Sequence, residues 1–314
     1  MKIKTSIWLV LISSIFYHAN AQSDFNVHRN LSEYMYRVRT EKYAPMPDRQ
    51  LYITPNANDL LNLLTTYYAD SLAKVRLKAC YLTYKAAKNV EDTILKQDAV
   101  MVLVFMLKDP DSGNVGSVAS WLSEFTPDDF NPRARDSLVS ALHNQVYYRD
   151  KIIKLTAFVG LKDQIEYIQT NLRNGVYQSG ADKWAAHLAL ARMGVEYEIN
   201  FCLEMVKRQG VNDDVVYELV PDLIYTRQKK TMDYVIELLH DKAKNCTSGN
   251  PEYGGEIMCG YRIMEFLAPV IKDFPLPVDS TGDLMVENYK KALKQLREWF
   301  LNRDNQYELI TNVY

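Results

Sequence analysis

The sequence has little glycine, few cysteines and few histidines, and each shortage narrows the chemistry that it can support. Among 314 residues there are 12 glycines, 4 cysteines and 5 histidines. The sequence contains no P-loop, no G-x-G-x-x-G, no G-x-S-x-G, no H-E-x-x-H and no C-x-x-C motif. These absences argue against a nucleotide loop, a local zinc site and the common nucleophile motifs, so we expect no cofactor, no metal and no catalytic residue.

Excess charge of one sign is also missing. The chain carries 37 basic and 39 acidic residues, and removing residues 1–21 would leave 35 basic and 39 acidic ones. No basic block stands out, so a nucleic-acid partner has no electrostatic support. No later run is apolar enough to supply the roughly 20 residues that a membrane span needs.

The amino-terminal segment has the pattern of a secretory signal peptide. Two lysines precede a largely apolar stretch, Ile7–Phe16, and Ala19 and Ala21 supply the small residues that precede a cleavage site. We therefore expect residues 1–21 to be a signal peptide. The mature protein would then be exported, to the periplasm or the extracellular space.

The rest of the chain divides into three parts. Residues 22–55 lack a sustained period and are expected to be an irregular lead-in, and 303–314 a tail. Between them, 56–302 has a helical apolar period interrupted by short turns. The period predicts an all-α fold with a lead helix over 57–69. Six helix pairs are expected to follow, at 71–109, 114–145, 147–174, 181–209, 213–242 and 256–302.

The helical part also shows an internal repeat. Superimposing Gly160, Gly194 and Arg227, which lie 34 and 33 residues apart, aligns apolar residues at helical spacing in both helices of the unit. Two of the aligned columns are Ile168, Cys202 and Val235, and Leu172, Val206 and Leu239. A repeat of this length predicts stacked units that cover one another's apolar faces.

Two stretches resemble HEAT-like repeats. Val75-Arg76-Leu77-Lys78-Ala79 is similar to the V-R-x-x-A start of such repeats, and Ala185–Gly194 resembles their alanine-rich helix ending in glycine. The resemblance implies an α-solenoid of about six antiparallel helix pairs, with a curved groove that binds another protein or a peptide. It implies a non-enzymatic scaffold or binding module. Polar residues on the second helices are candidate partner contacts, namely Glu166, Asn200 and Asp233.

An enzymatic alternative stays open. An all-helical hydrolase or lyase acting on glycans would need two carboxylates facing each other across a cleft. The acid pairs Asp128-Asp129 and Asp213-Asp214 fall at helix starts, where capping and the helix dipole explain carboxylates. His187 falls in an apolar column, so we interpret it as a partly buried, hydrogen-bonded side chain.

The last predicted helix, from about Asp283 to Asn302, is amphipathic. Lysine and arginine lie largely on one face, and such a helix can rest on an anionic membrane. Glu287 and Glu298 dilute the charge, so we favour a solvated face that caps the stack.

The four cysteines separate into two kinds. Cys80 and Cys202 fall in helix pairs too far apart for a disulfide, so we expect both to act as small apolar residues. Cys246 and Cys259 flank an irregular loop rich in Gly, Ser, Asn and Pro, and an exported protein favours their oxidation. We predict a Cys246–Cys259 disulfide. Tyr253, inside that loop, is a further candidate partner contact.

Overall fold

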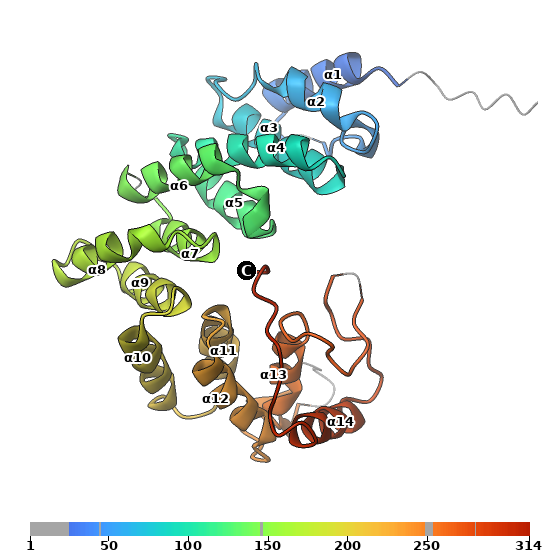
Figure 1. Ribbon diagram of the computed structural model, residues 1–314. Coiled ribbons are helices and arrows are strands. Elements are labelled where there is room, and N and C mark those ends of the chain that lie inside the picture. The colour runs from blue at the N-terminus through green and yellow to red at the C-terminus, as the bar shows by residue number, and fades with distance from the viewer. Residues whose placement is uncertain (1–24, 44, 145–146, 249–253, 280) are drawn as a thin grey trace, which may run out of the picture.

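The computed structural model describes residues 25–43, 45–144, 147–248, 254–279 and 281–314. Within these ranges the protein contains 14 α-helices and one short two-stranded hairpin, which confirms the all-α class. The helices follow one another along an open arc, and the carboxyl-terminal segment returns to the middle of that arc (Figure 1). The predicted signal peptide, residues 1–21, lies outside the described residues.

The helices are short and separated by brief turns. The first seven are α1 (Val27–Thr40), α2 (Ala57–Leu64), α3 (Ala73–Asn89), α4 (Thr93–Phe105), α5 (Ser112–Leu122), α6 (Pro132–Asn144) and α7 (Arg149–Phe158). The others are α8 (Ile165–Arg173), α9 (Gly180–Arg192), α10 (Glu196–Lys207), α11 (Val220–Tyr225), α12 (Lys229–His240), α13 (Gly260–Leu267) and α14 (Tyr289–Leu301). The strands β1 (Cys246–Thr247) and β2 (Glu256–Ile257) lie between α12 and α13.

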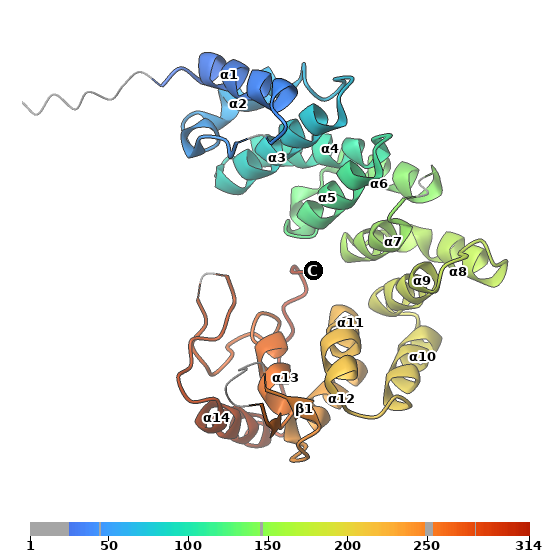
Figure 2. The same ribbon diagram turned by 180° about the vertical axis from the view of Figure 1, so that it is seen from behind.

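The arc has an inner and an outer row of helices. From α5 to α13 the odd-numbered helices line the concave side, while α6, α8, α10 and α12 lie outside them (Figures 1 and 2). Inner helices pack on their neighbours in the same row, as α7 does on α9, and each also contacts an outer helix, as α9 does α10.

Buried apolar side chains form three successive clusters among the described residues, so the helices are covered by their neighbours and share no single central core. The helix α9 joins two of these clusters. Ala186 and Leu190 pack on the side of α7, whereas Leu188 and Ala191 pack on the side of α11. Burying both sides of one helix in this way fixes the position of its end on the concave face.

Three residues that the repeat aligns share an unusual backbone conformation. Gly160, Gly194 and Arg227 follow α7, α9 and α11 with φ angles of +80°, +95° and +53°. Glycine adopts a positive φ at no steric cost, whereas a residue with a side chain pays about 1–2 kcal/mol. Arg227 therefore occupies a position at which the backbone favours glycine.

A buried ion pair connects α3 to the turn before α5. The Nε and Nη2 atoms of Arg76 donate to the two carboxylate oxygens of Asp109 over 2.7 and 2.8 Å. Arg76 is 8% and Asp109 5% exposed. A bidentate pair of this kind fixes the relative position of the two segments, and losing one partner would leave the other charge buried and alone.

The amino-terminal segment differs from the sequence prediction. Residues 22–55 were expected to be irregular, but they contain α1, which Asn26 caps by accepting from the N–H of Arg29 over 2.8 Å. Its buried residues recur at helical spacing and pack against α2 and α3. They are Val27, Leu31, Tyr34, Met35 and Val38. Charged side chains between them, those of Arg29, Glu33 and Arg37, obscure the apolar period in the sequence.

The last helix is shorter than predicted. It begins at Tyr289 rather than near Asp283, because Asn288 caps it by accepting from the N–H of Lys291 over 2.9 Å. The residues before it form turns, in which the Asp279 carboxylate accepts from the N–H of Asp283 over 3.0 Å.

Candidate binding site on the concave face

The concave face is occupied by residues 306–314 of the chain itself. They are the larger part of the tail predicted over 303–314, they are not helical, and from here on the tail means residues 306–314. The N–H of Lys272 donates to the carbonyl of Glu308 over 3.0 Å, and the N–H of Ile310 donates to the carbonyl of Val270 over 2.9 Å. From this pairing the tail crosses the inner row of helices and ends at Tyr314 in the middle of the arc (Figures 1 and 2). The face thus holds a polypeptide segment in the observed structure.

Two arginines hold the tail by its main chain, and we call them the guanidinium pair. Arg192 ends α9, and Arg227 follows α11. Their acceptors in the tail are the main-chain oxygen atoms of Ile310 (2.9 Å), Thr311 (3.0 Å), Val313 (3.2 Å from each arginine) and Tyr314 (3.1 Å). Because these atoms belong to the main chain, the hydrogen bonds from the two arginines do not depend on which side chains the tail carries.

The guanidinium pair is itself held in place. The Arg192 guanidinium lies over the rings of Phe158 and Tyr225, 5.0 and 4.7 Å from their centroids, and donates to the Tyr225 carbonyl. Arg227 is 8% exposed and donates to the Ile224 carbonyl. Stacked and hydrogen-bonded guanidinium groups lose little freedom on binding, so the site is preorganised.

Burial makes the positive charges of the pair costly. It lowers the pKa of Arg192, and burial together with the neighbouring Arg192 charge lowers the pKa of Arg227 to about 9. Two cations close together in a poorly solvated site favour the approach of acceptors, above all anionic ones.

The side chain of Tyr314 fills an aromatic seat formed by Phe158 and Tyr225. Its ring centroid lies 5.3 Å from that of Phe158 and 5.2 Å from that of Tyr225. Lys154 Nζ lies 5.8 Å from the Tyr314 ring centroid, and the Tyr225 hydroxyl donates to the Lys154 carbonyl over 2.5 Å. Burial raises the pKa of Tyr314 well above its ordinary value, so the seat holds a neutral aromatic ring.

A second polar group lies beside the seat. Lys154 Nζ donates to Oδ1 of Asp222 over 2.9 Å, and the indole N–H of Trp184 donates to Oδ2 over 2.6 Å. The three side chains come from α7, α11 and α9, so this network fixes the spacing of three inner helices. It also occupies both oxygens of the Asp222 carboxylate.

A pocket of about 660 Å³ adjoins the tail between α11, α13 and the turns before α14. Three carboxylates line it, those of Asp222, Glu265 and Asp283. Glu265 accepts from the Tyr289 hydroxyl over 2.7 Å and, on its other oxygen, from Arg262 over 3.5 Å. Asp222 and Glu265 thus each bind donors of the chain through both oxygens.

The candidate contacts predicted from the repeat lie elsewhere. Glu166, Asn200 and Asp233 belong to α8, α10 and α12, in the outer row, and not to the concave face (Figures 1 and 2). We expected the second helix of each pair to line the groove, whereas the first helices do so (Figures 1 and 2). Asp233 accepts from Lys229 Nζ and from the Tyr307 hydroxyl, both over 2.7 Å. Their contact with a partner stays a prediction, and Tyr253 lies outside the described residues.

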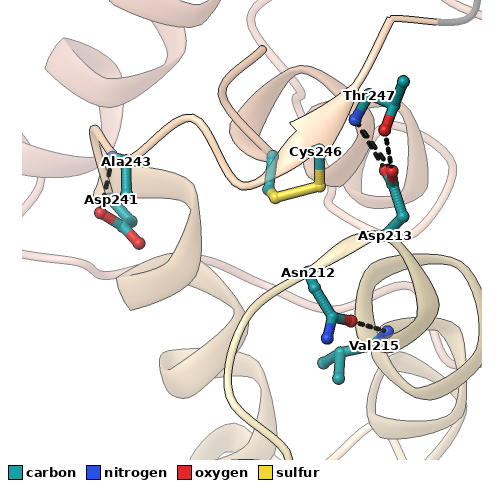
Figure 3. Close-up of a disulfide and its surroundings, with 8 residues drawn as sticks. Asn212, Asp213, Val215, Asp241, Ala243, Cys246 and Thr247 are labelled. Atoms are coloured by element: carbon teal, nitrogen blue, oxygen red, sulfur yellow. Dashed lines mark hydrogen bonds between the residues drawn. A yellow bond between two sulfur atoms is a disulfide. The ribbon is translucent and has the colours of Figure 1, made fainter. Parts of the chain in front are cut away.

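The predicted disulfide is present. Cys246 and Cys259 are bonded with a Cα–Cα distance of 5.1 Å, and the bridge joins β1 to the start of α13 (Figure 3). The Asp213 carboxylate accepts from the N–H of Thr247, the residue after Cys246, at 2.9 and 3.0 Å from its two oxygens. Asp213 begins the helical segment that continues through a π-helical stretch, Val215–Leu219, into α11, as the sequence predicted, and it anchors the hairpin to this helix start.

The remaining cysteines and His187 also have the expected environments. Cys80 and Cys202 are fully buried and unbonded, and burial raises the pKa of the Cys80 thiol to about 12. His187 is partly buried and its Nδ1 lies 2.6 Å from Oε2 of Glu198, which confirms a hydrogen-bonded histidine. These groups have packing roles.

The guanidinium pair was not predicted from the sequence. The one signal for it in the sequence is the arginine at position 227, where the aligned units of the repeat have Gly160 and Gly194. The tail contacts join residues more than 80 positions apart, which no local pattern reveals.

Comparison of the chain with family models, curated proteins and solved structures finds no match. No helix in the described parts of the chain is both long and apolar enough to cross a membrane. Over the same residues, no group of three histidine, cysteine, aspartate or glutamate side chains is placed to hold a metal ion.

Proposed function

We propose that the protein is a non-enzymatic, exported binding module whose concave face binds a non-helical segment of another protein. The observation that carries this proposal is the guanidinium pair, Arg192 and Arg227, which binds four main-chain oxygen atoms of the tail. A surface that binds one segment through its main chain can bind others of similar backbone shape.

The α-solenoid of HEAT-like helix pairs belongs to the same proposal. Its support is the double row of helices, the successive apolar clusters and the shared positive φ at Gly160, Gly194 and Arg227. Export is supported by the signal-peptide pattern of residues 1–21 and is compatible with the Cys246–Cys259 disulfide.

The backbone at Arg227 supports a binding role. An arginine in a left-handed conformation costs about 1–2 kcal/mol relative to the glycine of the aligned units. Its guanidinium recovers stability by bonding to Ile310, Val313 and Tyr314. Strain at one residue combined with contacts to one segment is a common feature of binding sites.

Peptide display on the intact protein tests the proposal. The selection would use the full chain carrying Tyr314→Ala, which weakens the tail by emptying the aromatic seat. We expect enriched peptides whose binding is lost in the additional variant Arg227→Gly and kept in Arg208→Gln, which removes the charge of an exposed arginine directly after α10. Selected peptides that bind equally well to all these variants would contradict the proposed site.

The enzymatic alternative has one observation in its favour, the three carboxylates that line the 660 Å³ pocket. The donors already bound to Asp222 and Glu265 give these two groups a structural role in the observed state. Glycan hydrolysis that disappears in Asp222→Asn and in Glu265→Gln, with both variants folded, would favour the enzyme over the binding module.

A further inference from the structure

The first half of the arc carries a basic surface that the proposed function does not use. One face of α3 presents five residues at intervals of three or four positions, and we call them the lysine stripe: Lys74, Lys78, Tyr81, Lys85 and Lys88. None of the five is buried, and none of the four lysines forms an ion pair with a carboxylate of the described residues. Other residues separate these lysines in the sequence, so the helix gathers a charge that no continuous basic block reveals.

Aromatic rings lie within and beside the lysine stripe. Two ammonium groups lie over the Tyr81 ring, with Lys78 Nζ 5.7 Å and Lys85 Nζ 5.6 Å from its centroid. Trp121 of α5 extends this aromatic surface, since its ring centroid lies 5.8 Å from that of Tyr81. Tyr84, which is 8% exposed, stacks on Trp121 at 5.4 Å with 11° between the ring planes, so a buried residue fixes the indole. The surface therefore offers flat apolar rings beside positive charges.

The charges of the lysine stripe call for an anionic ligand. Like charges three or four residues apart on a helix repel one another, as Lys74 and Lys78 do, and an anion lying along the stripe removes this repulsion. The ammonium groups over the Tyr81 ring are weakly held, because a cation gains little over a ring that is partly exposed to water. An anion can therefore draw Lys78 and Lys85 away from the ring and uncover its face.

The shape of the surface favours a polymer over a membrane. Lys151 of α7 continues the positive charge beyond α5, where its Nζ donates to Oγ of Ser120 over 2.8 Å. Both α5 and α7 lie on the concave side of the arc (Figures 1 and 2). A flat anionic bilayer meets the rim of an arc before its concave side, whereas a flexible polyanion can follow that side.

The spacing along α3 matches an acidic polysaccharide. Lys78 and Lys85 lie seven residues apart, which is about 10 Å along the helix axis, and Tyr81 lies between them. This distance is similar to the length of a disaccharide unit. A polysaccharide with a carboxylate on every second sugar can therefore meet both lysines, while the sugar between the two carboxylates stacks its apolar face on the Tyr81 ring.

We propose that the lysine stripe, together with Trp121, binds an acidic polysaccharide that carries a carboxylate on every second sugar. The choice of a polysaccharide over a nucleic acid rests on the proposed function, because an exported protein meets charged glycans outside the cytoplasm. The surface lies on α3 and α5 and shares no residue with the guanidinium pair, so the two sites can be tested separately.

The test uses hyaluronan, in which glucuronate alternates with a neutral sugar. A fluorescent hyaluronan oligosaccharide and its carboxylate methyl ester are titrated with the full-length protein at low salt, and anisotropy should show binding of the acid alone. The double variant Lys78→Gln with Lys85→Gln should weaken this binding about fivefold or more, because two exposed charge pairs are lost. Lys290→Gln with Lys291→Gln removes the same charge at the exposed start of α14 and should leave the affinity unchanged.

The variant Tyr81→Leu separates the ring from the charge. It keeps an apolar side chain and every lysine, so the affinity for hyaluronan should fall about threefold or more while its dependence on salt stays as in the wild type. A thermal melt followed by circular dichroism shows that this variant and the double lysine variant are folded.

Three results would overturn the polysaccharide site. They are hyaluronan binding that is unchanged in the double lysine variant, equal binding of the acid and its ester, and binding of a short oligothymidylate through Lys78 and Lys85 without binding of hyaluronan. The last result would identify a nucleic-acid surface. Arg227→Gly, which disables the guanidinium pair, should leave hyaluronan binding unchanged, so failure of the peptide site and failure of the polysaccharide site are distinguishable.

Discussion

Arg192 and Arg227 donate to the same atom, the carbonyl oxygen of Val313, over 3.2 Å each. They reach it from the ends of neighbouring inner helices, α9 and α11, whose packing sets the separation of the two guanidinium groups. Arg192 is the last residue of α9 and Arg227 lies two residues after α11, so the site is built on helix ends and not on long loops. This convergence is the central structural fact about the concave face.

The first prediction concerns the strained position at Arg227. Replacing Arg227 with glycine removes the guanidinium bonds to the tail and also relieves a positive φ. We expect the tail to become mobile while the melting temperature changes little. Removing about 1–2 kcal/mol of backbone strain at position 227 offsets the stability lost with the hydrogen bonds. A spin label on Asn312→Cys reports the mobility, since Cys80 and Cys202 are buried and Cys246 is bonded to Cys259.

Two companion variants control this experiment. Arg227→Ala also loses the guanidinium but keeps the strained backbone, so it should be about 1 kcal/mol less stable than Arg227→Gly. Gly194→Ala, at φ +95°, should cost a similar amount and leave the tail immobile. An immobile label in Arg227→Gly would show that the guanidinium does not hold the tail.

The second prediction concerns the ion pair in the first half of the arc. Arg76→Leu leaves the Asp109 carboxylate buried without its partner, so the free energy of unfolding should fall by about 3–5 kcal/mol. Urea unfolding followed by circular dichroism measures the loss. The double variant Arg76→Met with Asp109→Leu should recover most of it, and a double variant as unstable as the single one would contradict this account.

The third prediction follows from the pKa of Asp109. Burial by itself would raise this pKa, but the bonds from Arg76 and from the N–H of Asp111 outweigh burial and bring it below the ordinary value of an aspartate. A carboxylate whose pKa is lowered in the folded state contributes stability above its unfolded pKa, and that contribution disappears as the pH falls through the folded value. Unfolding free energies between pH 2 and 6 should therefore fall more steeply below pH 4 in the wild type than in Asp109→Asn. Parallel curves would assign the acid sensitivity to other carboxylates.

The fourth prediction concerns the disulfide. Alkylation of the denatured, unreduced protein should label two cysteines, Cys80 and Cys202, and intact-mass analysis counts the labels. Replacing Cys246 and Cys259 with serine should lower the free energy of unfolding by about 3 kcal/mol, because the bridge closes a loop in the unfolded chain. Four labels without reduction would contradict the bridge.

The sequence predicted the features that depend on local periodicity. The helical class, the equivalence of Gly160 and Gly194 and the burial of Cys202 all follow from apolar spacing within one or two helices. The disulfide followed from the contrast between an irregular loop and the regular helices around it. In α1 the same reasoning failed, because charged side chains separate its apolar positions.

The binding site on the concave face could not be predicted from local patterns in the sequence. Which row of helices faces inward depends on the curvature of the whole arc, so Glu166, Asn200 and Asp233 were expected on the wrong side. The tail reaches Arg192 and Arg227 only because the chain after α14 returns across the inner row, a long-range contact without a sequence pattern. In the sequence, Arg227 stood out only because the aligned units of the repeat have glycine at the same position.

The claim that the concave face binds a polypeptide through the guanidinium pair is tested most directly by displacing the tail. The full-length protein would carry Tyr314→Ala, which weakens the tethered tail, together with a spin label at Asn312→Cys, and would be titrated with the free-acid peptide of residues 306–314. We predict that the label changes from an immobile to a mobile spectrum with saturable dependence on peptide, and that Arg208→Gln behaves identically. A label that stays immobile at saturating peptide would contradict the account.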